Sequence, residues 1–213
     1  MSPKKAGFAL ALGALLLVAS ARAERIRHHF DSDSAGRPPG FFDAVVWGSP
    51  GEAEWKVLGD TNPPSTPNKL LQTLDNRPLG SIAVALRRSY VFQDGTVSVA
   101  LRRGAGLAGI VLRAAGEKDF LVLFLDVASG DARLSSYRGG KSIELARGKA
   151  EIDQEWGRLS VSAAGPQVSA RWNDKPLLTA TDPHPGPGRV GLATTGPGNA
   201  SFDEFVFEPS PAR

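Results

Sequence analysis

Three carboxylates occupy alternate positions in a short acidic run: Glu151, Asp153 and Glu155. On a strand, alternate side chains point to the same side of the sheet, so all three would face one way. A retaining glycosidase needs two carboxylates about 5 Å apart, and alternate strand residues reach roughly that separation. The run therefore has the residue types for glycoside hydrolysis. A solvated acidic loop is the alternative, because Trp156 follows directly and the run lies between two predicted strands.

Four further carboxylates lie near the two ends of the chain. Asp31 and Asp33 follow the first predicted strand, and Asp203 and Glu204 lie in the last. They meet if the terminal strands pair, and oxygen-rich clusters of this kind suit Ca²⁺. A structural calcium ion is one interpretation, and an ordinary strand end with exposed acids is the other. No other cofactor is indicated, and the absence of cysteine excludes thiolate metal sites.

The elements that must position these residues are strands. Beyond residue 23 we find no helix-period segment of useful length. Most of the 24 glycines and 16 prolines of the whole chain lie in this part, where they punctuate short runs rich in Val, Ile, Leu, Phe and Thr. This pattern predicts an all-β fold, a two-sheet antiparallel jelly-roll sandwich formed by residues 24–213 as one domain. The predicted strands are residues 26–30, 53–59, 69–75, 81–92, 96–103, 108–114, 119–127, 132–138, 142–147, 156–163, 166–172, 176–181, 188–194 and 200–207.

The alternation between residues 90 and 144 is regular enough to predict strand pairing. The predicted partners across successive turns are Tyr90 with Val99, Leu101 with Ile110, Leu112 with Leu121, Ile110 with Leu123, Leu125 with Leu134 and Ser136 with Ile143. Because side chains alternate with period two, these registers direct aliphatic side chains to one face. The residues of this predicted core are Val97, Val99, Leu101, Ile110, Leu112, Leu121, Leu123, Leu125, Leu134, Ile143 and Leu145.

The opposite face combines an apolar centre with a ring of polar groups. Val111, Val122 and Phe124 form the centre, and an apolar floor with a few convergent polar groups is typical of small-molecule and glycan sites. Sugars require bidentate donors and acceptors together with an aromatic surface. The candidate ligand-binding residues on this face are Arg87, Arg102, Arg113, Phe124, Asp126, Arg133, Tyr137 and Glu144. A solvated outer face is the alternative.

The first 23 residues have the layout of a cleavable secretory signal. Lys4 and Lys5 precede an apolar run, residues 8–18, and small residues surround the predicted cleavage site after Ala23. The run is shorter than the roughly 20 residues of a membrane span. Cleavage removes three of the 25 lysines and arginines and none of the 22 carboxylates, so the mature chain has no formal net charge. We therefore expect an exported, periplasmic or extracellular protein that neither inserts into the membrane nor binds nucleic acid.

Several segments together resemble a known group of bacterial proteins. They are Phe30-Asp31, Trp55-Lys56-Val57, Pro63-Pro64, and the segments 68–72, 94–99, 108–113, 156–159, 188–192 and 202–205. Over nearly the whole mature chain, they resemble secreted proteins of the concanavalin A-like lectin/glucanase superfamily, close to laminin-G-like and 3-keto-disaccharide hydrolase domains. The resemblance implies a curved front sheet whose concave face binds glycans in many relatives. The acidic run at Glu151 resembles the E-x-D-x-E catalytic run of laminarinase-type endoglucanases, without the aromatic subsites around it.

Three functions follow as hypotheses. The first is a secreted, non-catalytic carbohydrate-binding domain, in which Phe124 and Tyr137 stack on a glycan or oligosaccharide and the charged residues hydrogen-bond it. The second is a glycoside hydrolase that acts on a disaccharide or glucan, with carboxylates as acid and base. The third is an adhesion module that binds protein through the same face.

Overall fold

Short runs of β-branched and aromatic residues form the strands of this protein, and Gly, Pro and Asp separate them. The computed structural model describes residues 25–72, 80–104, 106–196 and 199–210. Its strands are β1 (Ile26–His28), β2 (Phe42–Gly48), β3 (Trp55–Gly59), β4 (Asn68–Gln72), β5 (Ser81–Arg87), β6 (Gly95–Arg102), β7 (Leu107–Gly116), β8 (Asp119–Asp126), β9 (Asp131–Arg138), β10 (Lys141–Lys149), β11 (Trp156–Ala164), β12 (Gln167–Trp172), β13 (Lys175–Thr181), β14 (Arg189–Thr195) and β15 (Ala200–Pro209). In the described residues, no helix has the length and apolar character needed to cross a membrane.

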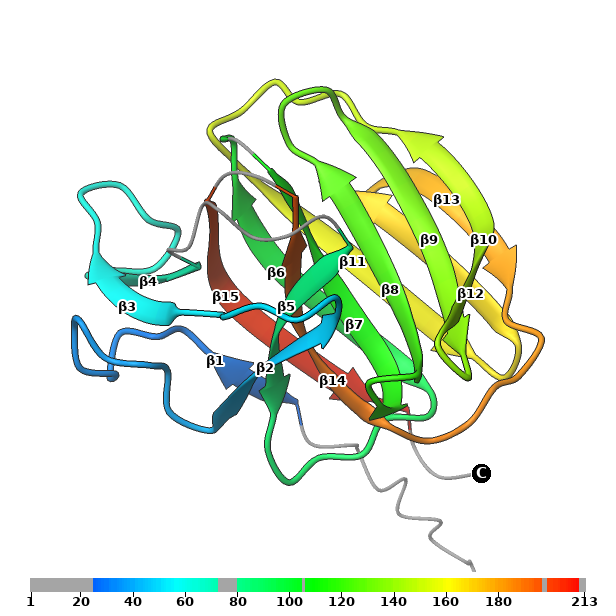
Figure 1. The fold of residues 1–213 in the computed structure, drawn as a ribbon. Helices are drawn as coiled ribbons and strands as arrows, with labels where there is room; N and C mark the ends of the chain where they lie inside the picture. The colour runs from blue at the N-terminus through cyan, green and yellow to red at the C-terminus, as the bar shows by residue number, and fades with distance from the viewer. Residues whose placement is uncertain (1–24, 73–79, 105, 197–198, 211–213) are drawn as a thin grey trace, which may run out of the picture.

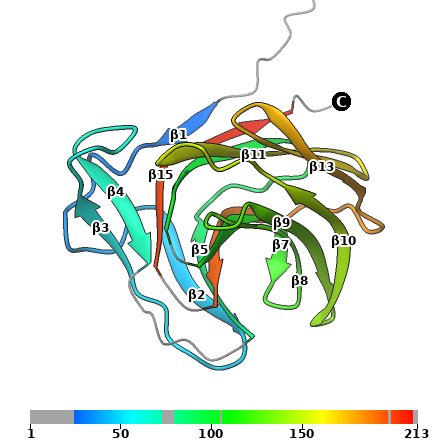
Figure 2. The ribbon, with the colours of Figure 1, turned by 90° about the horizontal axis from the view of Figure 1, so that it is seen from above.

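The strands form two antiparallel sheets packed face to face (Figure 1). The back sheet has the order β13-β12-β11-β6-β15-β4-β3, and β1 also pairs with β15. The front sheet has the order β10-β9-β8-β7-β14-β5-β2. Figure 2 shows that the front sheet curls strongly, with its concave face turned away from the back sheet. The all-β, two-sheet antiparallel sandwich predicted from the sequence is therefore confirmed.

Apolar side chains from both sheets fill the space between them. Nine of the eleven predicted core residues lie in this interior with no exposed surface. Each such side chain contributes roughly 1.5–3 kcal/mol to folding through burial. The prediction is wrong for Ile143, which is 57% exposed on edge strand β10. Leu145 is only partly buried, because a bulge between Glu144 and Ala146 interrupts the alternation there.

The predicted pairing is wrong around β6. This strand lies in the back sheet and pairs with β11 and β15, so neither Tyr90 with Val99 nor Leu101 with Ile110 is a pair. The segment after Arg102 crosses from the back sheet to the front sheet instead of closing a hairpin. The core residues of β6 and β7 still face the same interior, because they point inward from opposite sheets. Alternation thus predicted the face correctly but not the partner.

The remaining pairs of the front sheet agree closely with the prediction. Leu112 with Leu121, Ile110 with Leu123 and Ser136 with Ile143 are confirmed. Leu134 pairs with Leu123 rather than Leu125, a shift of two residues that leaves every side chain on its predicted face.

Most predicted strands agree with the structure to within two residues at each described end, and two larger differences remain. Strand β5 ends at Arg87, whereas the prediction continued to residue 92. Strand β2, residues 42–48, was not predicted. Residues 73–75 of one predicted strand, and the predicted signal at residues 1–23, lie outside the described residues.

Candidate functional site

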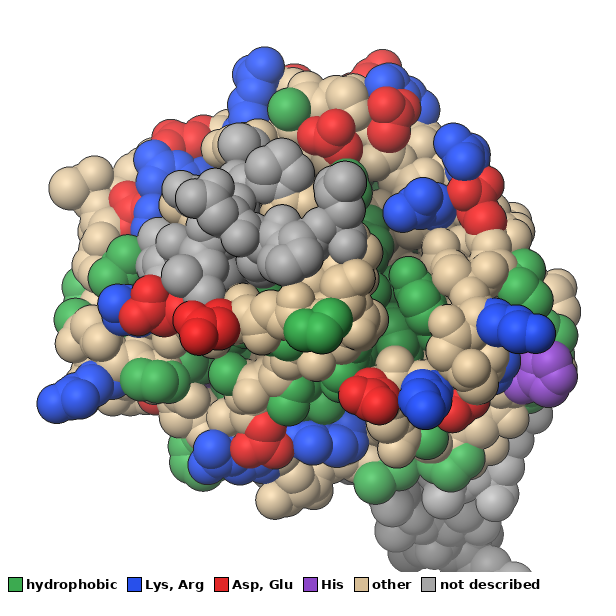
Figure 3. Space-filling view, viewed as in Figure 1, with side chains coloured by type: hydrophobic (Ala, Val, Ile, Leu, Met, Phe, Trp, Pro, Cys, Tyr) green, Lys and Arg blue, Asp and Glu red, His purple; other side chains and the backbone are tan. Residues whose placement is uncertain are grey.

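The concave face of the front sheet carries a second apolar cluster, separate from the core between the sheets. Alternate residues of β2, β5, β14, β8 and β9, and of β7 as far as its bulge, point onto this face. Its buried members are Trp47, Ile82, Val84, Leu86, Val111, Ala114, Phe120, Val122, Phe124 and Ala193, and Val45, Leu107 and Tyr137 pack against them half-buried. Figure 3 looks onto this face and shows hydrophobic side chains in a hollow, with charged side chains around it. We call this surface the groove.

One end of the groove is a hollow of about 490 Å³ beside the ends of β8 and β9. Its lining residues are Leu107, Phe124, Asp126, Asp131, Ala132, Arg133, Arg147, Gly148 and Lys149. Phe124 lies directly opposite Arg133 on the neighbouring strand, so an apolar ring and a guanidinium face the same space. We call this hollow the charged end of the groove.

The carboxylates of the charged end are held ionised by hydrogen bonds. Burial would raise the pKa of Asp126, but hydrogen bonds from the backbone N–H groups of Ala128 and Ser129 outweigh it and lower that pKa. The Lys149 ammonium, 2.9 Å from Asp131 Oδ1, lowers the pKa of Asp131. None of these carboxylates has the raised pKa that a general acid requires at neutral pH.

The other end of the groove is aromatic. The rings of Phe120 and Tyr137 stack with centroids 4.3 Å apart and planes 9° from parallel, and Trp47 lies 4.5 Å from Phe120 on the other side. Phe120 and Tyr137 also line a hollow of about 240 Å³ with Glu117 and Lys118 from the β7–β8 turn. Phe120 has no exposed surface, so the half-buried Tyr137 ring is the part of this stack that a ligand could contact. An aromatic ring beside charged groups suits the apolar and polar faces of a sugar ring.

Five of the eight predicted ligand-binding residues lie along this face. Phe124, Asp126 and Arg133 line the charged end, and Tyr137 lies at the aromatic end. Glu144 lies on edge strand β10, where Arg147 Nε donates to its carboxylate at 2.5 Å and lowers its pKa. Their binding role stays a prediction.

Arg102 lies elsewhere, and its predicted position is wrong. It is on the outer face of the back sheet, since its neighbour Leu101 points into the core. Its guanidinium forms ion pairs with Asp60 Oδ2 at 3.0 Å and with Glu155 Oε1 at 2.5 Å. Lys69 binds the same Asp60 oxygen at 2.5 Å, so Arg102 belongs to a charge network on the back sheet.

Arg113 does not face the groove either, because a bulge in β7 between Leu112 and Gly116 breaks the alternation there. Arg113 has a φ of 52° and is 1% exposed. Its Nη1 donates to Asp182 Oδ2 at 2.8 Å, its Nε to the Gln93 carbonyl at 2.9 Å, and its Nη2 to the Gly165 carbonyl at 2.6 Å. Arg113 is therefore a buried side chain that connects three loops, those between β5 and β6, between β11 and β12, and between β13 and β14.

Arg87 occupies the inner side of β5, alternating with Leu86 of the groove. Its Nη1 donates to the Phe41 carbonyl at 3.0 Å, and its guanidinium lies 4.8 Å from the Phe41 ring and 5.4 Å from the Tyr90 ring. It is 7% exposed and thus packs the end of the sandwich rather than the groove.

The acidic run at residues 151–155 forms the loop between β10 and β11, as its position between predicted strands indicated. Glu151 pairs with Lys175 Nζ at 2.8 Å, whereas Glu155 pairs with Arg102 and accepts a hydrogen bond from Asn62. Asp153 is exposed. Since the run is not a strand, it does not present its carboxylates on one side as the catalytic interpretation requires.

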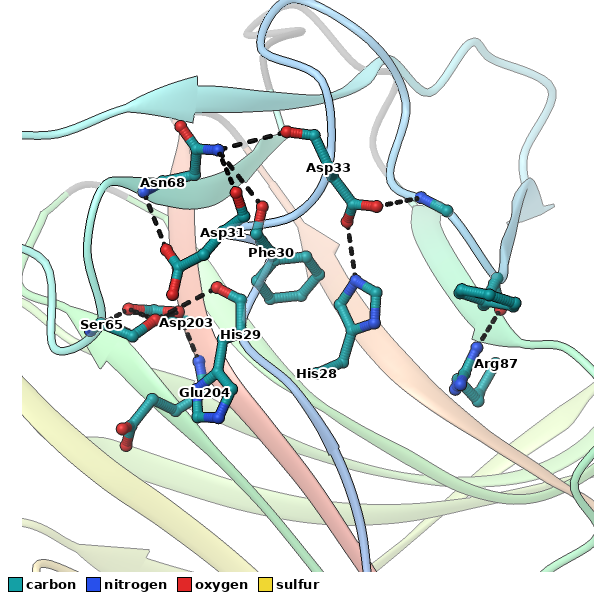
Figure 4. A network of polar contacts seen from close by, with 12 residues as sticks. His28, His29, Phe30, Asp31, Asp33, Ser65, Asn68, Arg87, Asp203 and Glu204 are labelled. Atoms are coloured by element: carbon teal, nitrogen blue, oxygen red, sulfur yellow. Dashed lines mark hydrogen bonds and ion pairs between the residues drawn. The ribbon is translucent and has the colours of Figure 1, made fainter.

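The calcium candidates lie around the paired terminal strands, in the network of Figure 4. Asp31 accepts from the Asn68 backbone N–H at 3.1 Å, and Asp33 binds His28 Nε2 at 2.7 Å. Asp203 accepts from the Ser65 backbone N–H at 2.7 Å and from its hydroxyl. Burial, together with the nearby charge of Asp31, raises the pKa of Asp203 to about 6 despite these hydrogen bonds. Among the described residues, no group of three His, Cys, Asp or Glu side chains is arranged to hold a metal ion.

Sequence reasoning missed part of the groove. Trp47 lies on the unpredicted strand β2, although the apolar residues at 45–47 were a signal for it. Asp131, Arg147 and Lys149 were not singled out, yet Arg147 and Lys149 continue the alternation through Glu144 once the bulge is taken into account.

Comparisons with known proteins agree on the architecture. No family model matches the sequence, and no curated protein matches it. Among solved structures, the carbohydrate-binding module CBM66 from Bacillus subtilis is 16% identical with a TM-score of 0.54, covering 72% of this chain and 95% of the module. Bacillus licheniformis β-glucanase is 7% identical with a TM-score of 0.58, covering 87% and 98%. The Ca²⁺/Man-bound exoplasmic/lumenal domain of VIP36 is 16% identical with a TM-score of 0.55, covering 80% and 84%.

These likenesses define the class of fold: an all-β sandwich shared by carbohydrate-binding modules, lectins and glucanases. The protein has the concanavalin A-like lectin/glucanase fold. At these identities the likeness establishes the fold and leaves activity to be argued from the site.

Proposed function

We propose that this protein is a carbohydrate-binding domain whose ligand lies in the groove on the front sheet. The observation that carries the proposal is the groove itself, an apolar floor with a stacked aromatic pair at one end and hydrogen-bonding charges at the other. Sugar rings present apolar C–H faces and a polar edge of hydroxyls, and this surface matches both.

The groove is built for binding more than for chemistry. Its residues come from the middle of hydrogen-bonded strands, so the surface is formed before a ligand arrives. The carboxylates at its charged end, Asp126 and Asp131, have lowered pKa values and hydrogen-bonded partners. A bound sugar would therefore meet acceptors for its hydroxyls rather than a proton donor for its glycosidic bond.

Two finer statements belong to the same proposal. Within its fold we place the chain with the laminin-G-like and 3-keto-disaccharide hydrolase-type domains, supported by the segments 94–99 and 202–205, which form adjacent strands β6 and β15. The predicted signal at residues 1–23 supports a periplasmic or extracellular place of action.

The test is glycan binding by the protein lacking residues 1–23, with released sugar measured in the same samples. We expect bound glycan without product. Replacing Tyr137 by alanine removes the outer ring of the aromatic stack, and we expect an affinity loss of about tenfold. Tyr90→Ala is the matched control, because Tyr90 packs on Phe207 away from the groove. Absence of binding to every glycan, or equal losses in the two variants, contradicts the proposal, and product release would make the protein a hydrolase.

A further inference from the structure

Two arginines lie directly opposite each other at the charged end of the groove. Arg133 on β9 and Arg147 on β10 are register partners, and both line the hollow of about 490 Å³. Like charges at directly opposed positions of a sheet repel each other. This pair therefore destabilises the empty groove slightly, and an anion placed between the two guanidinium groups would relieve the repulsion.

The neighbouring carboxylates do not neutralise both arginines. Glu144 pairs with Arg147 through a single nitrogen, Nε, and Asp131 pairs with Lys149. Asp126 Oδ1 accepts hydrogen bonds from two backbone N–H groups of the β8–β9 turn. In the described part of the chain, no carboxylate lies within ion-pair distance of Arg133. The charge of Arg133 nevertheless contributes to the lowered pKa of Glu144.

Arg133 therefore offers a planar set of donors to a ligand. A guanidinium has five N–H donors in a fixed fork that matches the two oxygens of a carboxylate or sulfate group. Phe124, directly across from Arg133, and Leu107 form the apolar wall of the same hollow, and 3% of Phe124 is exposed there. An anion bound to Arg133 would therefore lie in a hollow that also has an apolar wall.

Building on the proposed function, we infer that the groove takes an acidic glycan, whose carboxylate or sulfate group is held between Arg133 and Arg147. Asp126 and Asp131 lie on the far side of Arg133 from the aromatic stack, along the same strands. The acidic group then lies at the charged end, and the glycan extends along the groove toward Tyr137, whose side chain is half-buried.

The test compares glycans that differ only in charge. Oligogalacturonate is compared with its fully methyl-esterified form, and a sulfated galactan oligosaccharide with its desulfated form, by titration calorimetry at low ionic strength. We expect the acidic member of at least one pair to bind about tenfold more tightly or better, as charge-assisted hydrogen bonds imply. The pair that shows the difference distinguishes a carboxylate from a sulfate ligand. We also expect the preference to shrink in high salt.

Three variants assign the effect to the arginines. Arg133→Gln should abolish the preference, because it should weaken binding of the acidic glycan about tenfold more than binding of its neutral partner, and Arg147→Gln should reduce the preference. Arg171→Gln, an exposed arginine on back-sheet strand β12, should change neither. If neutral and acidic forms bind equally, or if Arg133→Gln retains the preference, the inference is wrong and the carbohydrate-binding proposal stands. If neither pair binds, the inference is wrong, whereas the carbohydrate-binding proposal fails only if no glycan of any kind binds.

Discussion

Replacing Arg113 by methionine should destabilise the protein strongly without a specific effect on ligand binding. Methionine keeps most of the volume of the side chain but removes its charge and its donors. The Asp182 carboxylate, which has no exposed surface, would lose its 2.8 Å ion pair and keep only the longer contact with Arg138 Nη2 at 3.6 Å. The Gln93 and Gly165 carbonyls would also lose their donors. Breaking one side of a buried ion pair costs about 3–5 kcal/mol, a large share of the roughly 5–15 kcal/mol by which folded domains are stable.

The assay is urea unfolding at pH 7. With a slope of about 2 kcal/mol per molar urea, the midpoint should fall by about 1.5–2.5 M. Arg171→Met, an exposed arginine, should shift the midpoint little. The double variant Arg113→Met with Asp182→Leu should recover part of the loss, because it removes a buried carboxylate that has lost its closest cationic partner.

Two results would refute this reasoning. One is a loss below about 1 kcal/mol for Arg113→Met with an unchanged slope, which would mean that water or a neighbour satisfies Asp182. The other is strict additivity of the two substitutions, since groups in direct contact should be coupled. Equal glycan affinity per folded molecule would confirm that Arg113 supports the fold rather than the ligand.

The remaining predictions concern the back sheet and its packing. The pKa of Asp203 is raised to about 6 from an ordinary 3.8, so its contribution to stability is complete below about pH 4 and is lost as the pH rises through 6. Urea unfolding across this window should therefore show the wild type gaining up to about 3 kcal/mol, relative to Asp203→Asn, as the pH falls from 7 to 4; parallel pH profiles would contradict this. Gly157→Ala should lower the free energy of unfolding by about 1–3 kcal/mol, because the added Cβ would lie 2.1 Å from the Trp172 ring. Gly186→Ala is the control, because no atom lies within 4 Å of its added Cβ, and thermal unfolding should show no change for it.

Sequence alternation predicted which side chains face inward but not which strands are neighbours. The Gly-rich segment after Arg102 is equally compatible with a hairpin and with a crossing between sheets, because both need a flexible turn and both keep Leu101 and Ile110 in the core. Choosing between them depends on the long-range pairing of β6 with β11 and β15, which no local pattern encodes.

The candidate site was predictable where strands are regular and not where they bulge. Phe124, Arg133 and Tyr137 lie in uninterrupted ladders, and all three face the groove as predicted. The prediction that Arg113 faces the groove is wrong because the bulge turns this side chain inward. The positive φ of Arg113 could not be predicted, because only glycine adopts it readily. Arg102 was misplaced because its strand belongs to the other sheet.

The alternation along β9 also bears on how readily this domain can change its preferences. Arg133, Ser135 and Tyr137 face the groove, whereas the intervening Leu134 and Ser136 face the core. Mutations at the outward positions can therefore alter recognition while the inward positions preserve stability, so the two properties are largely free to evolve independently. Such a strand is a natural starting point for a library in which only the outward residues are randomised.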